Sequence, residues 1–345
     1  MKIGVLCPAE IAARRFMPAL SKVKEFEFAG IAVNSLDERF GSSADENNKN
    51  QIQVIENGYK KAEALTKQYG GKIYGSYEDM VKSKDIEAIY IPLPPSLHYY
   101  WAKQALINGK HVLVEKPSTI SLRQSLELIN IAKDSNVAIH ENYMFVFHKQ
   151  LEEIIEIIKS GDIGDIRLIQ IMFGFPHRDS NDFRYNKDLG GGALIDAGGY
   201  TLKLAKILLG ENVEVENAQL NYDLNYDVDI YGSGIVSNSK GEVAQISFGM
   251  DNCYRCDLNV WGSKGSLLTK RILTAPDKFV PTVTIKKGND EAVMELSSDD
   301  AFEKSIRYFE KCINDSAIRN ESFLNIVNQA ELLSQFMDIA TIYKK

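Results

Sequence analysis

The chain has 345 residues, of which 44% are hydrophobic, and its formal net charge is -7. This length favours two domains, and the acidic balance argues against a nucleic-acid partner because binding to phosphates needs clustered cations. Its apolar runs are too short to span a membrane or to form the core of a signal peptide, and its four cysteines are too few for a disulfide framework. We therefore expect a cytoplasmic protein without a membrane partner.

Strand and helix patterns alternate over the first third of the chain. Short β-branched and apolar runs predict the strands, and apolar residues at helical spacing predict the helices. The predicted strands are residues 2–6, 26–33, 73–74, 86–91 and 110–117, and the predicted helices are residues 11–23, 62–69, 77–82 and 97–108. Because strands that alternate with helices are joined by right-handed crossovers, we expect a doubly wound parallel sheet.

Residues 36–59 interrupt this alternation. The segment is polar, rich in asparagine and without a clear period, and it is unusually long for a connection inside a compact domain. We expect a mobile loop or a small appended helix. Arg39 lies in it and is interpreted as a solvated side chain, although it could reach a phosphate.

The pattern changes after residue 120. Helices are predicted at 121–135 and 149–160, with a strand at 137–140 between them. From residue 166 onwards strands follow one another through short loops, which indicates an open, mostly antiparallel or mixed sheet. These strands are residues 166–175, 213–222, 227–236, 242–250, 256–261, 265–269 and 283–286. Two last helices, 301–315 and 322–343, either complete this second domain or pack back on the first.

The turn after the first predicted strand is the expected place for a dinucleotide pyrophosphate, which binds backbone amides at a helix N-terminus. The glycine fingerprint of such turns is replaced here by Cys7-Pro8-Ala9-Glu10-Ile11-Ala12. Cysteine and alanine remain small, but Pro8 removes a donor and Glu10 adds a negative charge. The second strand ends in Asn34-Ser35, which is neither an acid for a ribose diol nor an arginine for a 2′-phosphate, so NAD and NADP both remain open.

Two further loops lie at the carboxyl ends of predicted strands, where ligands bind in open α/β sheets. Pro92-Leu93-Pro94 forms a rigid apolar loop that suits the flat face of a cofactor, and His98 in the next helix is either part of that site or a helix-surface residue. Glu115-Lys116-Pro117 ends the fifth strand. Its alternative interpretation is an exposed ion pair at a strand end.

A triple-glycine loop precedes the next polar constellation. Gly190-Gly191-Gly192 leads into a predicted helix in which Asp196 and Tyr200 are four residues apart and so share one face. Gly198 and Gly199 lie between them, and glycines inside a helix cost about 1 kcal/mol each relative to alanine, so they need a packing or ligand reason. A carboxylate, a phenol and an amine could form a proton-transfer set for a carbinol–carbonyl couple.

The order of these motifs resembles the glucose-fructose oxidoreductase, inositol dehydrogenase and rhizopine-catabolism (Gfo/Idh/MocA) family over nearly the whole chain. Its most specific parts are Glu115-Lys116-Pro117 and the triple glycine followed by Asp196 and Tyr200. The resemblance implies a Rossmann domain at 1–120 that binds NAD or NADP. It also implies a substrate-binding and oligomerisation domain at 121–345, with an open, mostly antiparallel sheet.

Site residues follow from the same resemblance. Lys116 would touch the reacting oxygen, Asp196 would position the substrate and Tyr200 would donate or accept the proton; many relatives have histidine in place of this tyrosine. Tyr143 is a further candidate for substrate binding. The cofactor would be bound by Cys7, Pro8, Ala9, Glu10, Ile11, Asn34, Ser35, Pro92, Leu93, Pro94, His98, Glu115 and Lys116.

We therefore predict an NAD(P)-dependent oxidoreductase that interconverts a secondary hydroxyl and a ketone on a sugar, a sugar nucleotide or a related polyol. The alternative is a catalytically silent binding or regulatory protein that has lost the dinucleotide. The replaced glycines favour that alternative, whereas the retention of Lys116, Asp196 and Tyr200 argues against it.

No metal site is expected, because Cys253 and Cys256 form the one CxxC pair and have no second pair at zinc spacing. Alternating apolar residues in 242–248 and 257–261 predict an apolar sheet face. We expect another subunit to cover this face, which would make the protein a homodimer or homotetramer.

Overall fold

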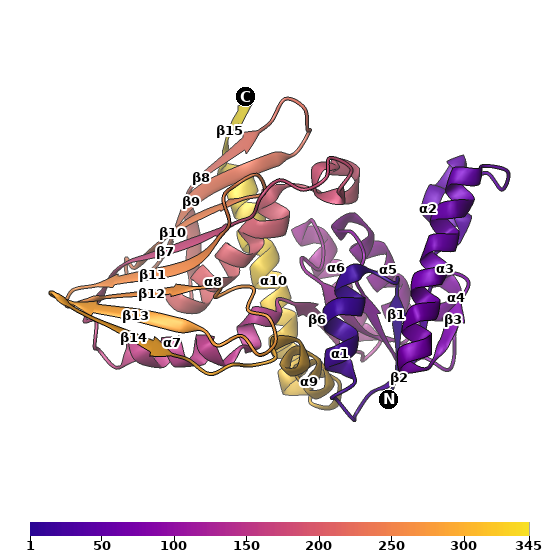
Figure 1. Ribbon diagram of the computed structural model, residues 1–345, viewed down its shortest axis with the longest axis horizontal. Helices are drawn as coiled ribbons and strands as arrows, with labels where there is room; N and C mark the ends of the chain where they lie inside the picture. The colour runs from indigo at the N-terminus through magenta and orange to yellow at the C-terminus, as the bar shows by residue number, and fades with distance from the viewer. Residues whose placement is uncertain (345) are drawn as a thin grey trace. The chain divides into compact units, whose positions relative to one another are not determined.

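The computed structural model describes residues 1–344 (Figure 1). The chain divides into two compact units. Unit 1 comprises residues 1–119, 123–142 and 302–326, and unit 2 comprises residues 120–122, 143–301 and the end of the chain from Val327. Among the described residues, no helix is both long and apolar enough to cross a membrane.

Unit 1 is built on a six-stranded parallel sheet. Its strands are β1 (Lys2–Leu6), β2 (Glu27–Ala32), β3 (Lys72–Tyr74), β4 (Ala88–Ile91), β5 (His111–Glu115) and β6 (Ile139–Asn142). They lie in the order β3-β2-β1-β4-β5-β6, and every neighbouring pair is parallel. The predicted doubly wound sheet is thus confirmed. Because the order reverses between β1 and β4, ligands are expected at the carboxyl ends of these two strands.

Helices connect these strands. They are the π-helical turn η1 (Ala12–Phe16) with α1 (Met17–Leu20), α2 (Leu36–Phe40), α3 (Lys49–Tyr69), α4 (Tyr77–Lys82), α5 (Pro95–Ile107) and α6 (Leu122–Asp134). Helix α3 packs on β2 and β3, and α5 packs on β4 and β5. The core between the layers is apolar, and within it the rings of Phe16 and Tyr90 stack with centroids 3.8 Å apart.

The polar segment 36–59 is mostly helical. Helix α2 and the first half of α3 occupy it, so the expected mobile loop is wrong and the helical alternative holds. Only Ala62 and Leu65 are buried among the 21 residues of α3, and the Asn48 side chain accepts from the amides of Asn50 and Gln51 to cap its start. An exposed helix has no apolar stripe, which is why the sequence showed only its last two turns.

Helix α5 also begins earlier than predicted. Its first residue is Pro95, where a ring-fixed φ and a missing N–H suit the first helical position. Ser96 lies inside the first turn, and its Oγ is buried without a hydrogen-bond partner among residues 1–344.

Unit 2 contains a nine-stranded mixed sheet in the order β14-β13-β12-β11-β7-β10-β9-β8-β15. The strands are β7 (Ile166–Gly174), β8 (Val213–Tyr222), β9 (Asp229–Asn238), β10 (Val243–Gly249), β11 (Arg255–Gly262), β12 (Ser266–Lys270), β13 (Thr282–Lys287), β14 (Asp290–Glu295) and β15 (Thr341–Lys344). The β10–β7 and β15–β8 pairs are parallel and the others are antiparallel, which confirms the predicted sheet type. The two edge strands, β14 and β15, were not predicted, because every residue in them is exposed and no apolar alternation marks them.

The apolar side of this sheet is covered within unit 2. Helix α8 (Gly199–Leu209) packs on β7, β9 and β10, and Figure 1 shows it lying along the sheet. The Phe248 ring also lies 5.5 Å from the Phe336 ring of α10 (Ser316–Ile339). The alternating apolar residues expected to meet another subunit therefore face inward, among them Ile246 and Val260. The opposite face carries Gln245, Asn259 and the exposed Trp261.

The last helices divide between the units. Helix α9 (Ala301–Asn314) and the first part of α10 belong to unit 1, and the rest of α10 belongs to unit 2. On unit 1 the Phe309 ring stacks on Phe26 at 5.8 Å, and Arg307 donates to the carbonyl of Lys22 at 3.0 Å. Of the two alternatives left open by the sequence, α9 follows the second and packs on the first domain.

Glu38 joins two helices of unit 1. Its carboxylate accepts the amides of Ser35 at the start of α2 and of Tyr77 and Glu78 at the start of α4, at 2.9, 3.0 and 2.9 Å. Losing a cap costs about 0.5–2 kcal/mol, so Glu38→Ala should lower the free energy of unfolding by about 1–3 kcal/mol in urea denaturation, with Glu38→Gln in between. Glu56→Ala on the exposed face of α3 is the matched control. Equal stability of the Glu38→Ala and Glu56→Ala variants would contradict the double cap.

Candidate functional site

The turn after β1 has the backbone shape of a dinucleotide site. Cys7 stands at the position of the first fingerprint glycine and has a φ of 113°, a value that favours glycine. The helix that follows begins at Glu10. Because the first amides of a helix have no intrahelical acceptor, the backbone N–H groups of Glu10 and Ile11 suit an anion there. The residues present thus fit a dinucleotide, even though no glycine remains.

Positive charges act on this turn. Burial raises the pKa of the Cys7 thiol, whereas a hydrogen bond with Tyr77 and the charges of Arg39 and Lys61 lower it. The Glu10 side chain is 83% exposed, and its Oε1 lies 3.7 Å from Nε of Arg14. The negative charge that the sequence places beside the expected phosphates is therefore partly offset by a cation on the same helix.

Asn34 and Ser35 follow β2. The Ser35 hydroxyl accepts the amide of Glu38 at 3.2 Å, and the Ser35 amide donates to the Glu38 carboxylate, which completes a capping box for α2. Asn34 is half-buried and uncharged. Neither residue places a carboxylate where it would repel a 2′-phosphate, and Arg39 is exposed on the same short helix.

His98 is fully buried, so the helix-surface interpretation is wrong. Its Nδ1 lies 2.7 Å from the carbonyl oxygen of Pro117, and its Nε2 lies 2.6 Å from that of Leu93. Burial lowers the pKa of His98 to about 4, and a neutral imidazole donates to only one of two such acceptors. The ring thus holds together the two loops that the sequence assigned to the cofactor.

Glu115 and Lys116 end β5 in unit 1. The Glu115 Oε1 accepts from the Tyr90 hydroxyl and from the Asn142 amide, both at 2.7 Å. Burial raises the pKa of Glu115, whereas these two hydrogen bonds and the charge of Lys116 lower it. The polar chain continues from Asn142 to Ser305, whose hydroxyl donates to the Asn142 carbonyl at 2.8 Å. The interpretation of Glu115 as an exposed strand-end residue is therefore wrong.

Asp196 and Tyr200 lie in unit 2 on one continuous helix. A π-helical turn, η6 (Leu194–Gly198), contains Asp196, and α8 contains Tyr200. Single π-turns inside helices are frequent at functional sites. The Tyr200 ring is enclosed by the rings of Tyr143, Phe145 and Phe173 at centroid distances of 5.2, 5.8 and 5.3 Å. These contacts fix the plane of the phenol.

The paired glycines have a packing reason. A Cβ at Gly198 would lie 2.9 Å from Leu194 Cδ1, and one at Gly199 would collide with the hydroxyl of Tyr143. The Gly199 carbonyl accepts from the Gln329 amide at 2.8 Å. Tyr143, predicted as a substrate residue, is 1% exposed and supports the helix at this close approach.

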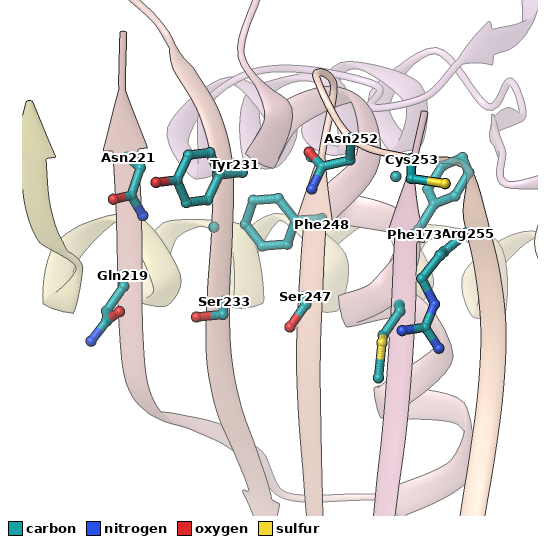
Figure 2. Close-up of a pocket in the computed structure, with 14 residues that line it drawn as sticks. Phe173, Gln219, Asn221, Tyr231, Ser233, Ser247, Phe248, Asn252, Cys253 and Arg255 are labelled. Atoms are coloured by element: carbon teal, nitrogen blue, oxygen red, sulfur yellow. The ribbon is translucent and has the colours of Figure 1, made fainter. Parts of the chain in front are cut away.

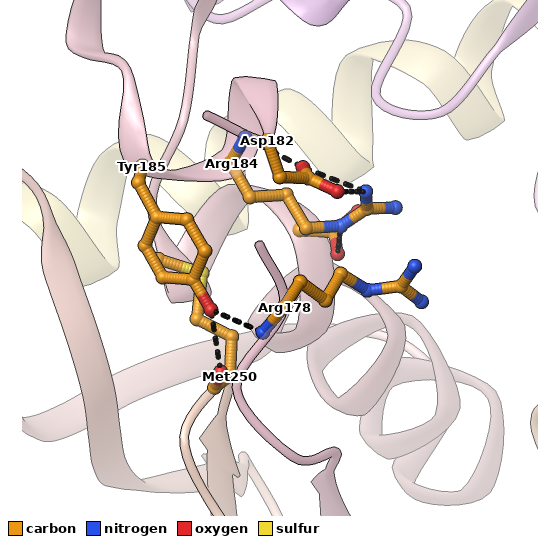
Figure 3. Close-up of polar contacts among 6 residues, drawn as sticks. Arg178, Asp182, Arg184, Tyr185 and Met250 are labelled. Carbon is orange, nitrogen blue, oxygen red and sulfur yellow. Dashed lines mark hydrogen bonds and ion pairs between the residues drawn. The ribbon is translucent and has the colours of Figure 1, made fainter. Parts of the chain in front are cut away.

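Asp196 is paired with an arginine that the sequence did not single out. Its Oδ2 accepts from Arg184 Nε at 2.6 Å. Arg184 Nη1 also donates to Asp182 Oδ1 at 3.1 Å (Figure 3). The pair is largely buried, with Arg184 19% and Asp196 9% exposed. Arg184 lies in the polar loop before the triple glycine, and only tertiary structure brings that loop to the helix that carries Asp196.

Asp229 caps the same helix from β9. Its Oδ2 accepts the amide of Leu194 at 2.6 Å, and a Cβ at Gly192 would collide with its Oδ1. This contact explains why a glycine with a φ of 121° precedes the helix. Burial raises the pKa of Asp229 to about 6, although the amides of Leu194 and Ala193 act in the opposite direction. A carboxylate flanked by Val228 and Ile230 was the one sequence signal that could have identified it.

A separate cavity of about 330 Å³ lies on unit 2 at one end of β7–β11 (Figure 2). Polar side chains of Asn221, Ser247, Asn252 and Arg255 line it beside the ring of Phe248. None of the predicted site residues lines it. Among residues 1–344, no group of three or more histidine, cysteine or acidic side chains could hold a metal ion, and all four cysteines are unpaired.

Comparisons with known proteins match both halves of the chain. Residues 28–143 match a family described as an oxidoreductase family with an NAD-binding Rossmann fold, and residues 151–268 match the C-terminal domain of the GFO/IDH/MocA family. The chain is 32% identical to a dTDP-3,4-didehydro-2,6-dideoxy-alpha-D-glucose 3-reductase of Actinomadura kijaniata, over 96% of this chain and 93% of the relative. It is 30% identical to the enzyme of the same name from Streptomyces violaceoruber, over 100% and 96%.

Solved structures agree with these matches. A 3-ketoreductase from Actinomadura kijaniata, in complex with NADP and TDP-benzene, superposes with a TM-score of 0.90 and 31% identity over 100% of this chain and 99% of its own. An aldose-aldose oxidoreductase from Caulobacter crescentus, at 20% identity and a TM-score of 0.78, shares the fold. The matches confirm the resemblance, the oxidoreductase assignment and the nicotinamide cofactor, and they do not support the silent binding alternative.

The buried Asp229 should make stability depend on pH. The folded pKa of Asp229, about 6, exceeds the ordinary value of 3.8. Its contribution to the free energy of unfolding is therefore fully present below pH 3.8 and is lost as the pH rises through 6. One pKa unit corresponds to about 1.4 kcal/mol. Between these two pH values the free energy of unfolding of Asp229→Asn should therefore rise by on the order of 3 kcal/mol relative to that of wild type. Denaturant titrations at several pH values measure the difference. Asp227→Asn, at an exposed pair with Lys187, is the control and should show no such gain.

Proposed function

Because the chain belongs to the Gfo/Idh/MocA family and is thus an NAD(P)-dependent oxidoreductase of hydroxyl and ketone groups on sugar-like substrates, we propose that it is a ketoreductase for a nucleotide-linked sugar. The expected reaction is reduction of a keto group at C3 of a deoxysugar carried on dTDP. The observation that carries this proposal is the match over nearly the whole chain to two reductases of that name.

Three side chains would perform the chemistry on the substrate. Bound nicotinamide would supply the hydride. Lys116 and Tyr200 carry an N–H and an O–H donor, and both would hydrogen-bond the ketone oxygen, with Tyr200 giving up the proton. Asp196, fixed by Arg184, would bind a neighbouring hydroxyl of the sugar. The Tyr143, Phe145 and Phe173 rings keep Tyr200 in one orientation, which favours proton transfer along one path.

The dinucleotide would be held in unit 1. Its pyrophosphate would lie on the turn from Cys7 to Ile11, its adenosine ribose near Asn34 and Ser35, and its nicotinamide near Glu115 and Lys116. The nicotinamide ring would be covered by the loop Pro92-Leu93-Pro94, which His98 contacts at the carbonyl oxygen of Leu93. We expect a preference for NADPH. Asn34 and Ser35 are uncharged and would not repel a 2′-phosphate on the adenosine ribose, and Arg39 is exposed on the helix that begins after Ser35.

The wider organisation is part of the same proposal. Residues 1–120 would bind the cofactor, and residues 121–345 would bind the substrate and a second copy of the chain. We expect the protein to work in the cytoplasm, since its four thiols are unpaired and its cofactor is a nicotinamide dinucleotide. The outward face of the nine-stranded sheet carries exposed apolar residues that suit a symmetric partner, namely Tyr231, Ile235, Trp261, Leu268 and Val293.

The role of Lys116 can be tested with the reaction itself. Wild type should oxidise NADPH in the presence of a dTDP-linked 3-ketosugar, and Lys116→Ala should lower kcat by about 100-fold or more because an interaction with the reacting oxygen is lost. Its affinity for NADPH, followed by fluorescence, should stay within about twofold. Lys133→Ala, an exposed lysine on α6, is the control. A Lys116→Ala variant whose kcat is within tenfold of the wild-type value would contradict this role of Lys116. If wild type does not reduce the nucleotide-linked ketosugar, the proposed substrate class is wrong.

The proposed subunit interface on the outward face of the nine-stranded sheet can be tested by measuring the molar mass in solution. Trp261 is 60% exposed and pairs with Ser266 at the end of the β11–β12 ladder, and replacing it by glutamate would bury a charge in any interface formed there. Light scattering at micromolar concentration should show a dimer or tetramer for wild type and a smaller species for Trp261→Glu. Leu324→Glu, equally exposed but on α10, should keep the wild-type mass. A monomeric wild type would contradict the proposal.

A further inference from the structure

Residues 175–186, called the arginine loop below, connect β7 to the triple glycine and are held firmly. The Tyr185 hydroxyl accepts the amide of Arg178 at 3.0 Å and donates to the carbonyl of Met250 at 3.1 Å (Figure 3). The Tyr185 side chain is buried. One phenol therefore ties the start of the loop to the end of the sheet, and the position of Arg178 is fixed by unit 2 itself.

The loop carries two arginines in different electrostatic situations. Arg184 is neutralised by Asp182 and Asp196, both within hydrogen-bond distance. Arg178 is exposed, its guanidinium lies 5.2 Å from the centre of the Phe175 ring, and no carboxylate among residues 1–344 pairs with it. Figure 3 shows the two guanidinium groups extending to the same side, away from the Tyr185 ring. A planar guanidinium supported on a ring and without a counter-charge suits a phosphate, which it can bind through two hydrogen bonds.

Three rings lie beside Arg178 and are called the aromatic platform. His177 stacks on Tyr185 with centroids 4.6 Å apart, Tyr185 lies 4.7 Å from Tyr226, and His177 Nε2 is 3.3 Å from the Tyr226 hydroxyl. His177 is exposed and Tyr226 is half-buried, so the platform offers ring surface to solvent. Aromatic surfaces of this kind stack nucleic-acid bases with about 1–3 kcal/mol per base.

We propose that Arg178 and the aromatic platform form the subsite for the nucleoside diphosphate of the substrate. Arg178 binds the diphosphate, and His177 with Tyr226 supports the base. The inference rests on the proposed function, which it deepens by assigning the nucleotide to residues of unit 2. The arginine loop leads directly to Arg184 and so to Asp196, which places the sugar end of such a ligand at the predicted substrate residue.

Calorimetry with dTDP and dTMP tests the subsite. Titrations use the protein saturated with NADP⁺, so that neither nucleotide can bind at the cofactor turn. Arg178→Ala should weaken the binding of dTDP by about tenfold or more. It should weaken the binding of dTMP by less, because dTMP has one phosphate fewer for Arg178 to contact. Arg178→Lys should recover part of the affinity. His177→Ala should weaken both ligands by a similar factor, since both carry the base.

Arg167→Ala is the matched control, because Arg167 is an exposed arginine at the opposite end of β7, paired with Asp165. It should bind dTDP as wild type does. Equal dTDP affinity of Arg178→Ala and wild type overturns the subsite but leaves the proposed function standing. If wild type binds neither dTDP nor dTMP, the subsite and the proposed substrate class fail together, while NADPH binding remains as evidence for the oxidoreductase.

Discussion

Close packing of a glycine pair against a tyrosine is the constraint on which unit 2 of this protein depends. Gly199 approaches the Tyr143 hydroxyl so closely that any side chain there would displace the helix or the ring. Gly198 allows the same approach to Leu194 and Phe248. The cost of about 1 kcal/mol for each helical glycine is offset because the helix can lie directly on the sheet and enclose Tyr200 among aromatic rings.

Hydrogen-bonded carboxylates then hold the polar parts of the fold in place. Asp229 accepts the first amide of the helix that carries Asp196 and Tyr200, Glu38 accepts amides from two helices of unit 1, and Glu115 is held by Tyr90 and Asn142. Asp229 is 5% exposed and would be costly if unpaired, since a buried charge without partners loses its hydration. The hydrogen bonds of these carboxylates satisfy amides at the starts of α2, α4 and η6 and hold the side chain at the end of β5.

The turn after β1 keeps the backbone shape of a dinucleotide fingerprint although its three glycines are replaced. Cys7 takes the positive φ for which glycine is normally used, a conformation that costs a non-glycine residue on the order of 1–3 kcal/mol. The thiol is buried against Tyr77, and Arg39 and Lys61 supply positive charge around it. Surrounding contacts therefore impose the backbone geometry that the glycines would otherwise allow.

The sequence by itself determined the local order of the chain: the alternation of strands and helices before residue 120, the succession of strands after it, and α4 and β8 to the residue. Those features follow from apolar periodicity, which is written in neighbouring residues. It could not determine where α3 begins, nor β14 or β15, because exposed segments carry no such period. Nor could it find the partners of its own candidates. Arg184 beside Asp196, Asp229 beneath the same helix and the two carbonyls around His98 are separated from them by 5 to 35 residues along the chain, and only folding brings such groups within hydrogen-bond distance.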